Sequence, residues 1–254
     1  MNLLALDTST EFLSLALQLS DDKGCDKIYS HYCQAGAKAS ELILPQIQSL
    51  LDAANMTLKD LHGIAFGAGP GAFTGVRIAC GVAQGLGFGA NIPVVGVNTL
   101  LAVAQASGAN KVIVCLDARM GEIYHATFIK IKTSEKANHQ WQEVSETKVC
   151  KPEAVPILAR RASKINMYDK DWVGAGSGWA VYGEVLGGIY AENLEKNLPQ
   201  DLYYKVTPTA EAILQLAKPI FAAGEAKPAS EAAPIYIRNR VALTTIEREA
   251  GQRL

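Results

Sequence analysis

A glycine-rich stretch at residues 67–77, GAGPGAFTGVR, carries the strongest chemical signal in the sequence. An apolar run precedes it and a helical pattern of small residues follows it. Glycine-rich turns between a strand and a helix often bind phosphate, because the free backbone amides at a helix start attract anions. The residues around the turn decide which kind of phosphate site it could form.

Two common phosphate motifs fit the stretch poorly. A P-loop needs a lysine that reaches the terminal phosphates, and no lysine lies between Lys59 and Lys111. A dinucleotide fingerprint is met literally by Gly67, Gly69 and Ala72. That fingerprint also needs an acidic residue about 20 positions later to hold the ribose hydroxyls, and residues 61–116 contain no Asp or Glu. We therefore predict neither a P-loop nor a NAD site.

Polar residues at the ends of two apolar runs suggest a nucleotide site in a cleft. Asp7 ends the run LLALD, Asp117 ends the run VIVCLD, and a second glycine cluster occupies residues 174–178. Two carboxylates can hold Mg²⁺ through water, while hydroxyls and glycines can meet phosphates and adenosine. Capping of strand ends by the two carboxylates is an alternative that stays open. The candidate cleft residues are Asp7, Thr8, Ser9, Asp117, Gly174 and Gly176.

The helical pattern after the turn places Gly81, Gly85 and Gly89 four residues apart, on one helix face. Each glycine inside a helix costs roughly 0.5–1 kcal/mol relative to alanine, so the row needs a reason. Two reasons stay open. The bare face packs closely on another helix, supplied by a partner chain, or it packs on the protein's own sheet.

The elements that must position these residues recur in both halves of the chain. Each half reads as a strand ending in Asp, a hairpin, a helix, a short strand and a glycine turn, with the two copies roughly 110 residues apart. This order predicts two related α/β lobes with a cleft between them. Predicted strands are 2–6, 12–19, 27–33, 63–66, 93–96, 111–116, 122–132, 141–149 and 172–174; predicted helices are 40–54, 78–89, 152–163 and 209–223. Residues 224–234 read as a flexible linker and 234–240 as an extended tail segment.

Composition narrows the class of protein. The chain has 254 residues, 49% of them apolar, a formal net charge of −1 and a pI near 6.4, which disfavours strong unaided binding of RNA. The five cysteines show no CxxC spacing, so we expect reduced thiols in a cytoplasmic protein. The N-terminus lacks the basic region of a signal peptide, and glycines, prolines and Arg77 interrupt the most apolar window. No membrane segment is expected.

Several motifs together resemble the TsaB (YeaZ) family, the non-catalytic paralogues of TsaD/Kae1. They are LALDTST, SELILPQI, AGPGAFTGVR, GLGFGANIPVVGVNTL and PIYIRNRVA, in the family's order and over nearly the whole chain. The resemblance implies an α/β fold of two ribonuclease-H-like lobes, the actin-like (ASKHA) ATPase fold. Residues 1–100 would form the first lobe, completed by helix 209–223. Residues 101–208 would form the smaller second lobe, and 224–254 the linker and tail.

The resemblance also implies a function. TsaB-like chains are non-catalytic subunits required for N6-threonylcarbamoyladenosine (t6A) at adenosine 37 of tRNAs that read codons starting with A. They bind TsaD and, with the ATPase TsaE, support threonylcarbamoyl transfer from threonylcarbamoyl-AMP. They contact tRNA only through the complex, and form a homodimer with the same surface when alone. The resemblance places the interface on helices at about 39–54 and 74–89. The implied interface residues are Leu42, Ile43, Ile47, Arg77, Gly81 and Gly85.

The same resemblance implies no catalytic residue, no metal and no cofactor, with ATP or ADP bound weakly or at a partner boundary at most. TsaD holds a metal with an HxxxH motif, and Thr99 and Val103 stand at the two histidine positions in our alignment. Neither side chain replaces an imidazole ligand. The turn then has a structural role, carried by Gly67, Gly69, Pro70, Gly71, Thr74 and Gly75.

Two rival classes of function stay open. An active ATPase or sugar kinase of the same superfamily would use Asp7 or Asp117 as its catalytic carboxylate. A peptidase is the second rival, although the sequence has no HExxH and its four histidines are scattered.

Overall fold

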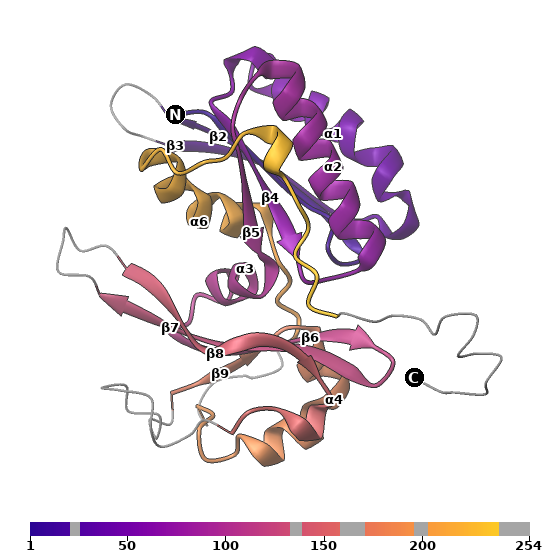
Figure 1. The fold of residues 1–254 in the computed structure, drawn as a ribbon, viewed down its shortest axis with the longest axis vertical. Coiled ribbons are helices and arrows are strands. Elements are labelled where there is room, and N and C mark those ends of the chain that lie inside the picture. The colour runs from indigo at the N-terminus through magenta and orange to yellow at the C-terminus, as the bar shows by residue number, and fades with distance from the viewer. Residues whose placement is uncertain (21–25, 133–138, 158–170, 196–202, 239–254) are drawn as a thin grey trace.

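The chain folds into two lobes, one above the other in Figure 1, each built on its own sheet. The structure is a computed structural model that describes residues 1–20, 26–132, 139–157, 171–195 and 203–238. Cys25 and parts of the predicted helix 152–163 and of the predicted tail segment 234–240 lie outside these residues.

The first sheet has the strand order β3-β2-β1-β4-β5. Its strands are β1 (Leu3–Asp7), β2 (Phe12–Ser20), β3 (Asp26–Gln34), β4 (Gly63–Gly69) and β5 (Val94–Asn98). The first three form the predicted antiparallel meander, and β4 and β5 extend the sheet in parallel with β1. The central strand β1 is buried at every residue, which explains its continuous apolar run.

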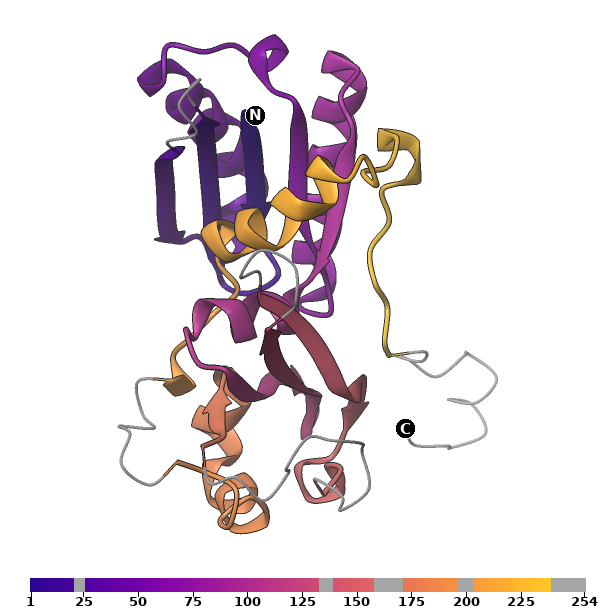
Figure 2. The ribbon, with the colours of Figure 1, turned by 90° about the vertical axis from the view of Figure 1, so that its left-hand side faces the viewer.

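Helices cover both faces of this first sheet, as Figures 1 and 2 show. They are α1 (Ala39–Ala53), α2 (Phe73–Ala90) and α6 (Ala210–Ala222). Leu4 and Leu6 of β1 pack in one core with α1 and α2, whereas Leu3 and Ala5 pack in another with α6. The two-residue period of a strand sends neighbouring side chains to opposite faces, so one strand serves both cores.

The second sheet has the strand order β8-β7-β6-β9. Its strands are β6 (Lys111–Arg119), β7 (Glu122–Lys132), β8 (His139–Cys150) and β9 (Val173–Ala175), and its helices are α3 (Thr99–Ala106) and α4 (Ser177–Ile189). Val103 of α3 packs on one face of the sheet and Trp179 of α4 on the other. The structure thus confirms an α/β architecture with two sheets. The boundaries of the lobes at residues 100, 208 and 224 stay predictions.

The structure differs from the sequence prediction at four helices. Neither α3 nor α4 is predicted: α3 follows β5 without a loop, and glycines in α4 read as a turn. The predicted helix 152–163 is a single 3-10 turn, Pro152–Ala154, followed by non-helical residues 155–157, and its remainder lies outside the described residues. Helix α2 begins at Phe73, five residues before the start at residue 78 that the residue pattern predicts and one residue before the start at 74 that the family resemblance implies.

The segment predicted as a flexible linker, 224–234, is instead packed on the first lobe. The backbone of Lys227 pairs with Val94 of β5 through hydrogen bonds of 2.7 and 3.0 Å. A 3-10 turn, Ala229–Glu231, follows, and Ala229 is buried beside Gly87 of α2. Composition suggested a linker because small and polar residues dominate, but small side chains also allow close packing.

Candidate functional site

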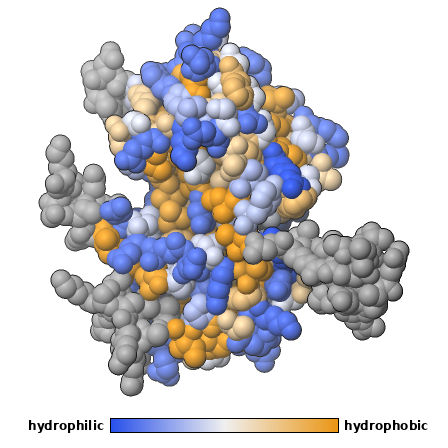
Figure 3. All heavy atoms as spheres, viewed as in Figure 1, coloured by the Kyte–Doolittle hydropathy of each residue, from blue (hydrophilic) through white to orange (hydrophobic). Residues whose placement is uncertain are grey.

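A cleft of about 1110 Å³ lies between the lobes. Its walls are the loop after β1, the glycine turn with the start of α2, the end of β6, the start of α4, and the tail residues 235–238. Figure 3 shows hydrophobic side chains gathered along the junction of the two lobes on the face in view. The sequence analysis predicts a nucleotide site in a cleft at this position between the lobes.

Asp7 does not line the cleft. Its side chain is 1% exposed, and its Oδ1 accepts hydrogen bonds from the N–H and the Oγ–H of Ser9 at 3.0 and 2.9 Å. Its Oδ2 has no hydrogen-bond partner among the described residues and lies against the Cα of Gly67. Burial raises the pKa of Asp7 from 3.8 to about 7, although the Ser9 hydrogen bonds lower it. The carboxyl group of Asp7 therefore caps the loop after its own strand, which is the alternative to binding a ligand in the cleft.

The loop after β1 fills the glycine turn. The hydroxyl of Thr8 donates to the carbonyl oxygen of Gly75 at 2.7 Å, and a Cβ at Gly75 would overlap the carbonyl oxygen of Thr8. A Cβ at Gly71 would lie 2.6 Å from the carbonyl oxygen of Ser9, which accepts the N–H of Ala72 at 2.7 Å. The glycines thus allow one backbone to approach another. The N–H of Ala72, which could otherwise face a phosphate, donates to the backbone of Ser9.

The rest of the turn is held by a hydrogen bond from α3. Gly69 has a φ of +108°, which favours glycine, and joins Pro70 through a cis peptide bond. Thr99 of α3 donates its hydroxyl to the carbonyl oxygen of Pro70. Thr74, at the start of α2, is exposed and lines the cleft.

Asp117 lines the cleft but is paired within its own strand end. Its Oδ2 lies 3.1 Å from a guanidinium nitrogen of Arg119, and its Oδ1 accepts the N–H of Arg119 at 2.9 Å. The predictions for Gly174 and Gly176 are wrong, because neither lines the cleft. Gly174 lies under the ring of Trp179, and Gly176 packs on the carbonyl oxygen of Cys115. The structure brings Thr8, Ser9 and Asp117 to one cleft and leaves Asp7, Gly174 and Gly176 outside it.

The tail supplies residues that the sequence did not indicate. Arg77 is one of the implied interface residues, and its Nε donates to the hydroxyl of Tyr236 of the same chain at 2.8 Å. Its guanidinium group also stacks over the rings of Phe73 and Tyr236. In the sequence, the basic and aromatic residues of the tail were the one indication that it binds a surface. They did not indicate which surface it contacts.

The proposed interface residues divide between surface and core. Ile43 and Ile47 are buried against the first sheet, so the structure corrects their assignment to a surface, and Leu42 is partly buried. Gly81 and Gly85 are exposed, and a Cβ at either meets no atom within 4 Å. The alternative that this row packs on its own sheet is therefore excluded in the isolated chain.

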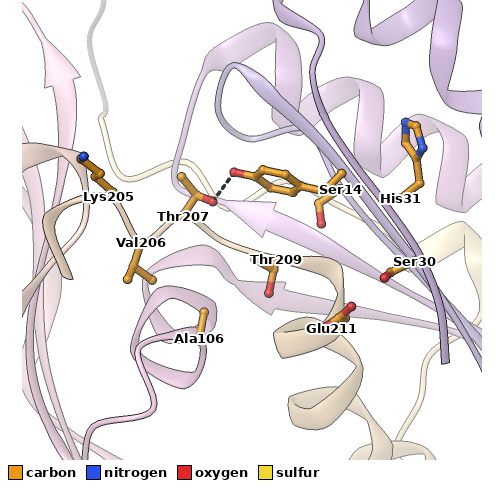
Figure 4. Close-up of a pocket in the computed structure, with 10 residues that line it drawn as sticks. Ser14, Ser30, His31, Ala106, Lys205, Val206, Thr207, Thr209 and Glu211 are labelled. Carbon is orange, nitrogen blue, oxygen red and sulfur yellow. Dashed lines mark hydrogen bonds between the residues drawn. The ribbon is translucent and has the colours of Figure 1, made fainter. Parts of the chain in front are cut away.

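A second pocket, of about 400 Å³, lies between β2, β3, α3 and the start of α6 (Figure 4). The backbone N–H of Ala210 donates to the buried hydroxyl oxygen of Ser14 at 2.8 Å and so anchors α6 to the sheet. In Figure 4, Lys205 lies at the left of the view and Glu211 near its lower centre, so the two charged side chains are not side by side. The pocket therefore gathers no evident catalytic set.

The described residues contain neither a cluster of metal ligands nor a membrane-crossing helix. Those residues contain no group of three or more His, Cys, Asp or Glu side chains placed to hold a metal ion. None of the helices within them combines the length and the apolar character needed to cross a bilayer.

Comparison with known proteins identifies the family. The family model described as TsaD, tRNA N6-adenosine threonylcarbamoyltransferase, matches residues 33–245. The TsaB protein of Escherichia coli K12, named a tRNA threonylcarbamoyladenosine biosynthesis protein, is 34% identical, with 95% of this chain and 96% of that one covered. The protein of the same name from Haemophilus influenzae is 35% identical, with 95% of each chain covered. The solved structure of YeaZ from Pseudomonas aeruginosa is 36% identical and superposes with a TM-score of 0.70, covering 93% of this chain and all of that one (100%).

The family-model match, residues 33–245, extends over parts of both lobes and includes the glycine turn. These matches confirm the actin-like class of fold that the motifs implied. The chain belongs to the TsaB (YeaZ) family.

Proposed function

We propose that this chain is the non-catalytic subunit of a cytoplasmic complex that makes t6A at adenosine 37 of tRNAs reading codons that start with A. It binds the catalytic TsaD-type subunit and, with a TsaE-type ATPase, supports threonylcarbamoyl transfer from threonylcarbamoyl-AMP. It meets tRNA only through the complex. Family membership supports the role in tRNA threonylcarbamoyladenosine biosynthesis.

The observation that carries the proposal is the bare face of α2. Gly81, Gly85 and Gly89 are exposed with no atom within 4 Å of an added Cβ, although each glycine weakens the helix. Phe88, on the same helix, is 61% exposed, and Leu44 of the neighbouring α1 is 51% exposed. A face that lacks side chains lets a second helix approach closely, which compensates for the weaker helix only in a complex. We propose that this face binds TsaD, and binds a second copy of this chain when TsaD is absent.

Two features of the cleft support a non-catalytic role. Thr99 and Val103, at the positions of the TsaD metal histidines, are fully buried, and the Thr99 hydroxyl donates to Pro70. The loop after β1 occupies the glycine turn that would otherwise face a phosphate. We therefore propose that the chain alone binds ATP or ADP weakly, with tighter binding only at a partner boundary.

Sedimentation velocity tests the partner face with a matched pair of substitutions. Gly85→Leu places a bulky side chain on the bare face, whereas Gly188→Leu makes the same change at an exposed glycine of α4 that also has open space around it. We expect G85L to abolish both the homodimer and the complex with the TsaD of the same cell. G188L should behave like the unchanged chain. Both variants should remain folded, because leucine is the better helix former.

A normal complex formed by G85L would contradict the partner face. Failure of the unchanged chain to bind TsaD under any nucleotide or TsaE condition would contradict the proposed function itself. ATP turnover by the chain alone, lost in Asp117→Ala, would instead favour the kinase-like rival. Peptide cleavage that survives rigorous purification would favour a peptidase.

A further inference from the structure

The tail segment Pro234–Arg238 attaches first to the upper lobe. The backbone N–H of Ile235 donates to the carbonyl oxygen of Ala68 in β4 at 2.7 Å, next to Gly69. The carbonyl oxygen of Ile235 lies 2.9 Å from the place a Cβ at Gly69 would take, so only glycine leaves room for this approach. Tyr236 then accepts the hydrogen bond from Arg77 and contacts its guanidinium face.

Two residues later the same segment attaches to the lower lobe. Arg238 forms an ion pair with Glu122 at the start of β7 and donates to the carbonyl oxygen of Ala118 at 3.1 Å. The side chains of Arg238 and Glu122 are only 13% and 33% exposed, so salt screens this pair less than it screens a surface pair. The Nε of Arg238 is buried without a partner among the described residues, which lowers the net stabilisation that this attachment provides.

The position of this segment gives these contacts a mechanical consequence. Among the described residues, the chain otherwise crosses between the lobes at α3 and at the residues leading into α6. Figure 2 shows the tail segment descending on the other side of the molecule from these two crossings. Two crossings on one side act as a hinge, and a third attachment across the cleft sets its opening.

We propose that Pro234–Arg238 is a clasp that holds the two lobes at one opening of the cleft. The Arg238–Glu122 ion pair is its releasable end. Because residues 235–238 also wall the cleft, release of the clasp widens the cleft and removes one of its walls. The clasp rests on contacts within the chain and is independent of the proposed function.

Interlobe distance distributions test the clasp. Spin labels on a keto amino acid placed at Ser49 and Glu184, exposed residues of α1 and α4, avoid the native cysteines. The labelled chain is diluted with unlabelled protein so that a homodimer adds no distance. We expect Arg238→Ala and Glu122→Arg each to shift the distribution to longer distances and to broaden it. The charge-swapped double variant, E122R with R238E, should return it toward the narrow form.

A control variant separates the clasp from general loosening of the tail. Lys227→Ala removes an exposed ion pair to Glu231 in the preceding segment, 224–234, within the first lobe. It should leave the distribution unchanged. Distributions in R238A and E122R that superpose on the unchanged protein would overturn the clasp. So would an equal shift in K227A, or a double variant as broad as the single ones. Circular dichroism verifies that each variant is folded.

Discussion

At the scale of single residues, the glycine turn is used for packing within the chain. Gly67 leaves room for the carboxyl group of Asp7, and Gly75 leaves room for the backbone of Thr8. The burial of Asp7 follows from this packing, because the loop after β1 lies between β4 and the start of α2. A motif that resembles a phosphate site has thereby become the contact between the first strand and the helix that carries the partner face.

Gly75→Ala should destabilise the protein by about 1–3 kcal/mol or more, because its methyl group would overlap the Thr8 carbonyl oxygen. Chemical denaturation measures the change. Gly81→Ala, on the same helix with open space around it, is the control and should stabilise by roughly 0.5–1 kcal/mol. Equal effects of the two substitutions would show that the close approach at Gly75 does not matter.

Asp7 and His125 should give stability opposite dependences on pH. The pKa of Asp7 is raised from 3.8 to about 7 by burial, so the folded state keeps a proton that the unfolded state loses, and stability falls as pH rises between these values. Burial lowers the pKa of His125 from 6.5 to about 4, so stability falls as pH drops from 6.5 to 4. The two slopes partly cancel between pH 4 and 6.5.

Substitution of either residue should reveal the slope of the other. Relative to the unchanged protein, Asp7→Asn should make stability rise with pH by up to about 1.4 kcal/mol per unit between pH 4 and 6.5. His125→Gln should change the slope by a similar amount in the opposite sense, and its amide can still donate to Tyr190, the partner of His125 at 3.0 Å. Urea denaturation at several pH values provides the measurement. Identical profiles in all three proteins would contradict both shifts.

At the scale of elements, α2 and α6 each pack one face on the first sheet and leave another face exposed. On α2, Ala79 and Ala83 face the sheet, whereas the row that begins at Gly81 faces solvent. On α6, Ile213 and Leu214 are buried against the first sheet even though the helix follows the second lobe in the chain. The core of the first sheet therefore includes α6, a helix that follows the second lobe in the sequence.

Ile213→Ala should cost about 2–5 kcal/mol, the range for an aliphatic side chain removed from a packed core. Glu211→Ala, at an exposed site on the same helix, should cost less than about 0.5 kcal/mol. Chemical denaturation of both variants measures the difference. A cost below about 1 kcal/mol for I213A would show that α6 does not complete the first core.

At the scale of the whole molecule, α3 couples the lobes. It packs on α6 in the first lobe and on β6 in the second, and Gln105 of α3 hydrogen-bonds both Gln215 and Trp141. All three tryptophans, at residues 141, 172 and 179, belong to the second lobe. Tryptophan fluorescence therefore reports on one lobe, while far-UV circular dichroism reports on both.

We expect the two probes to give coincident unfolding transitions, because the shared helix makes the lobes unfold together. I213A should shift the fluorescence transition as much as the circular dichroism transition, although the substitution lies in the other lobe. Urea titrations followed by both signals provide the test. A fluorescence transition that stays in place in I213A would show that the lobes unfold independently.

The sequence by itself determined the kinds of element, most of their order and the family. Apolar runs ending in Asp7 and Asp117 are strands, the alternating segments between them are hairpins, and the missing lysine and acid exclude two phosphate motifs. These conclusions depend on local periodicity and on residue types, which a linear sequence contains in full. The helices α3 and α4 were missed because their local signals resemble a continuing loop and a glycine turn.

Only the tertiary structure decided which faces are covered and which residues meet. Periodicity places Ile43 and Ile47 on one face of α1, but the sheet beneath decides that this face is buried. It places the glycines of α2 in a row, but the fold decides that none of the described residues covers this row. The contact of Arg77 with Tyr236 joins residues 159 positions apart. No local pattern encodes such a contact, because it depends on where the whole fold brings the two segments.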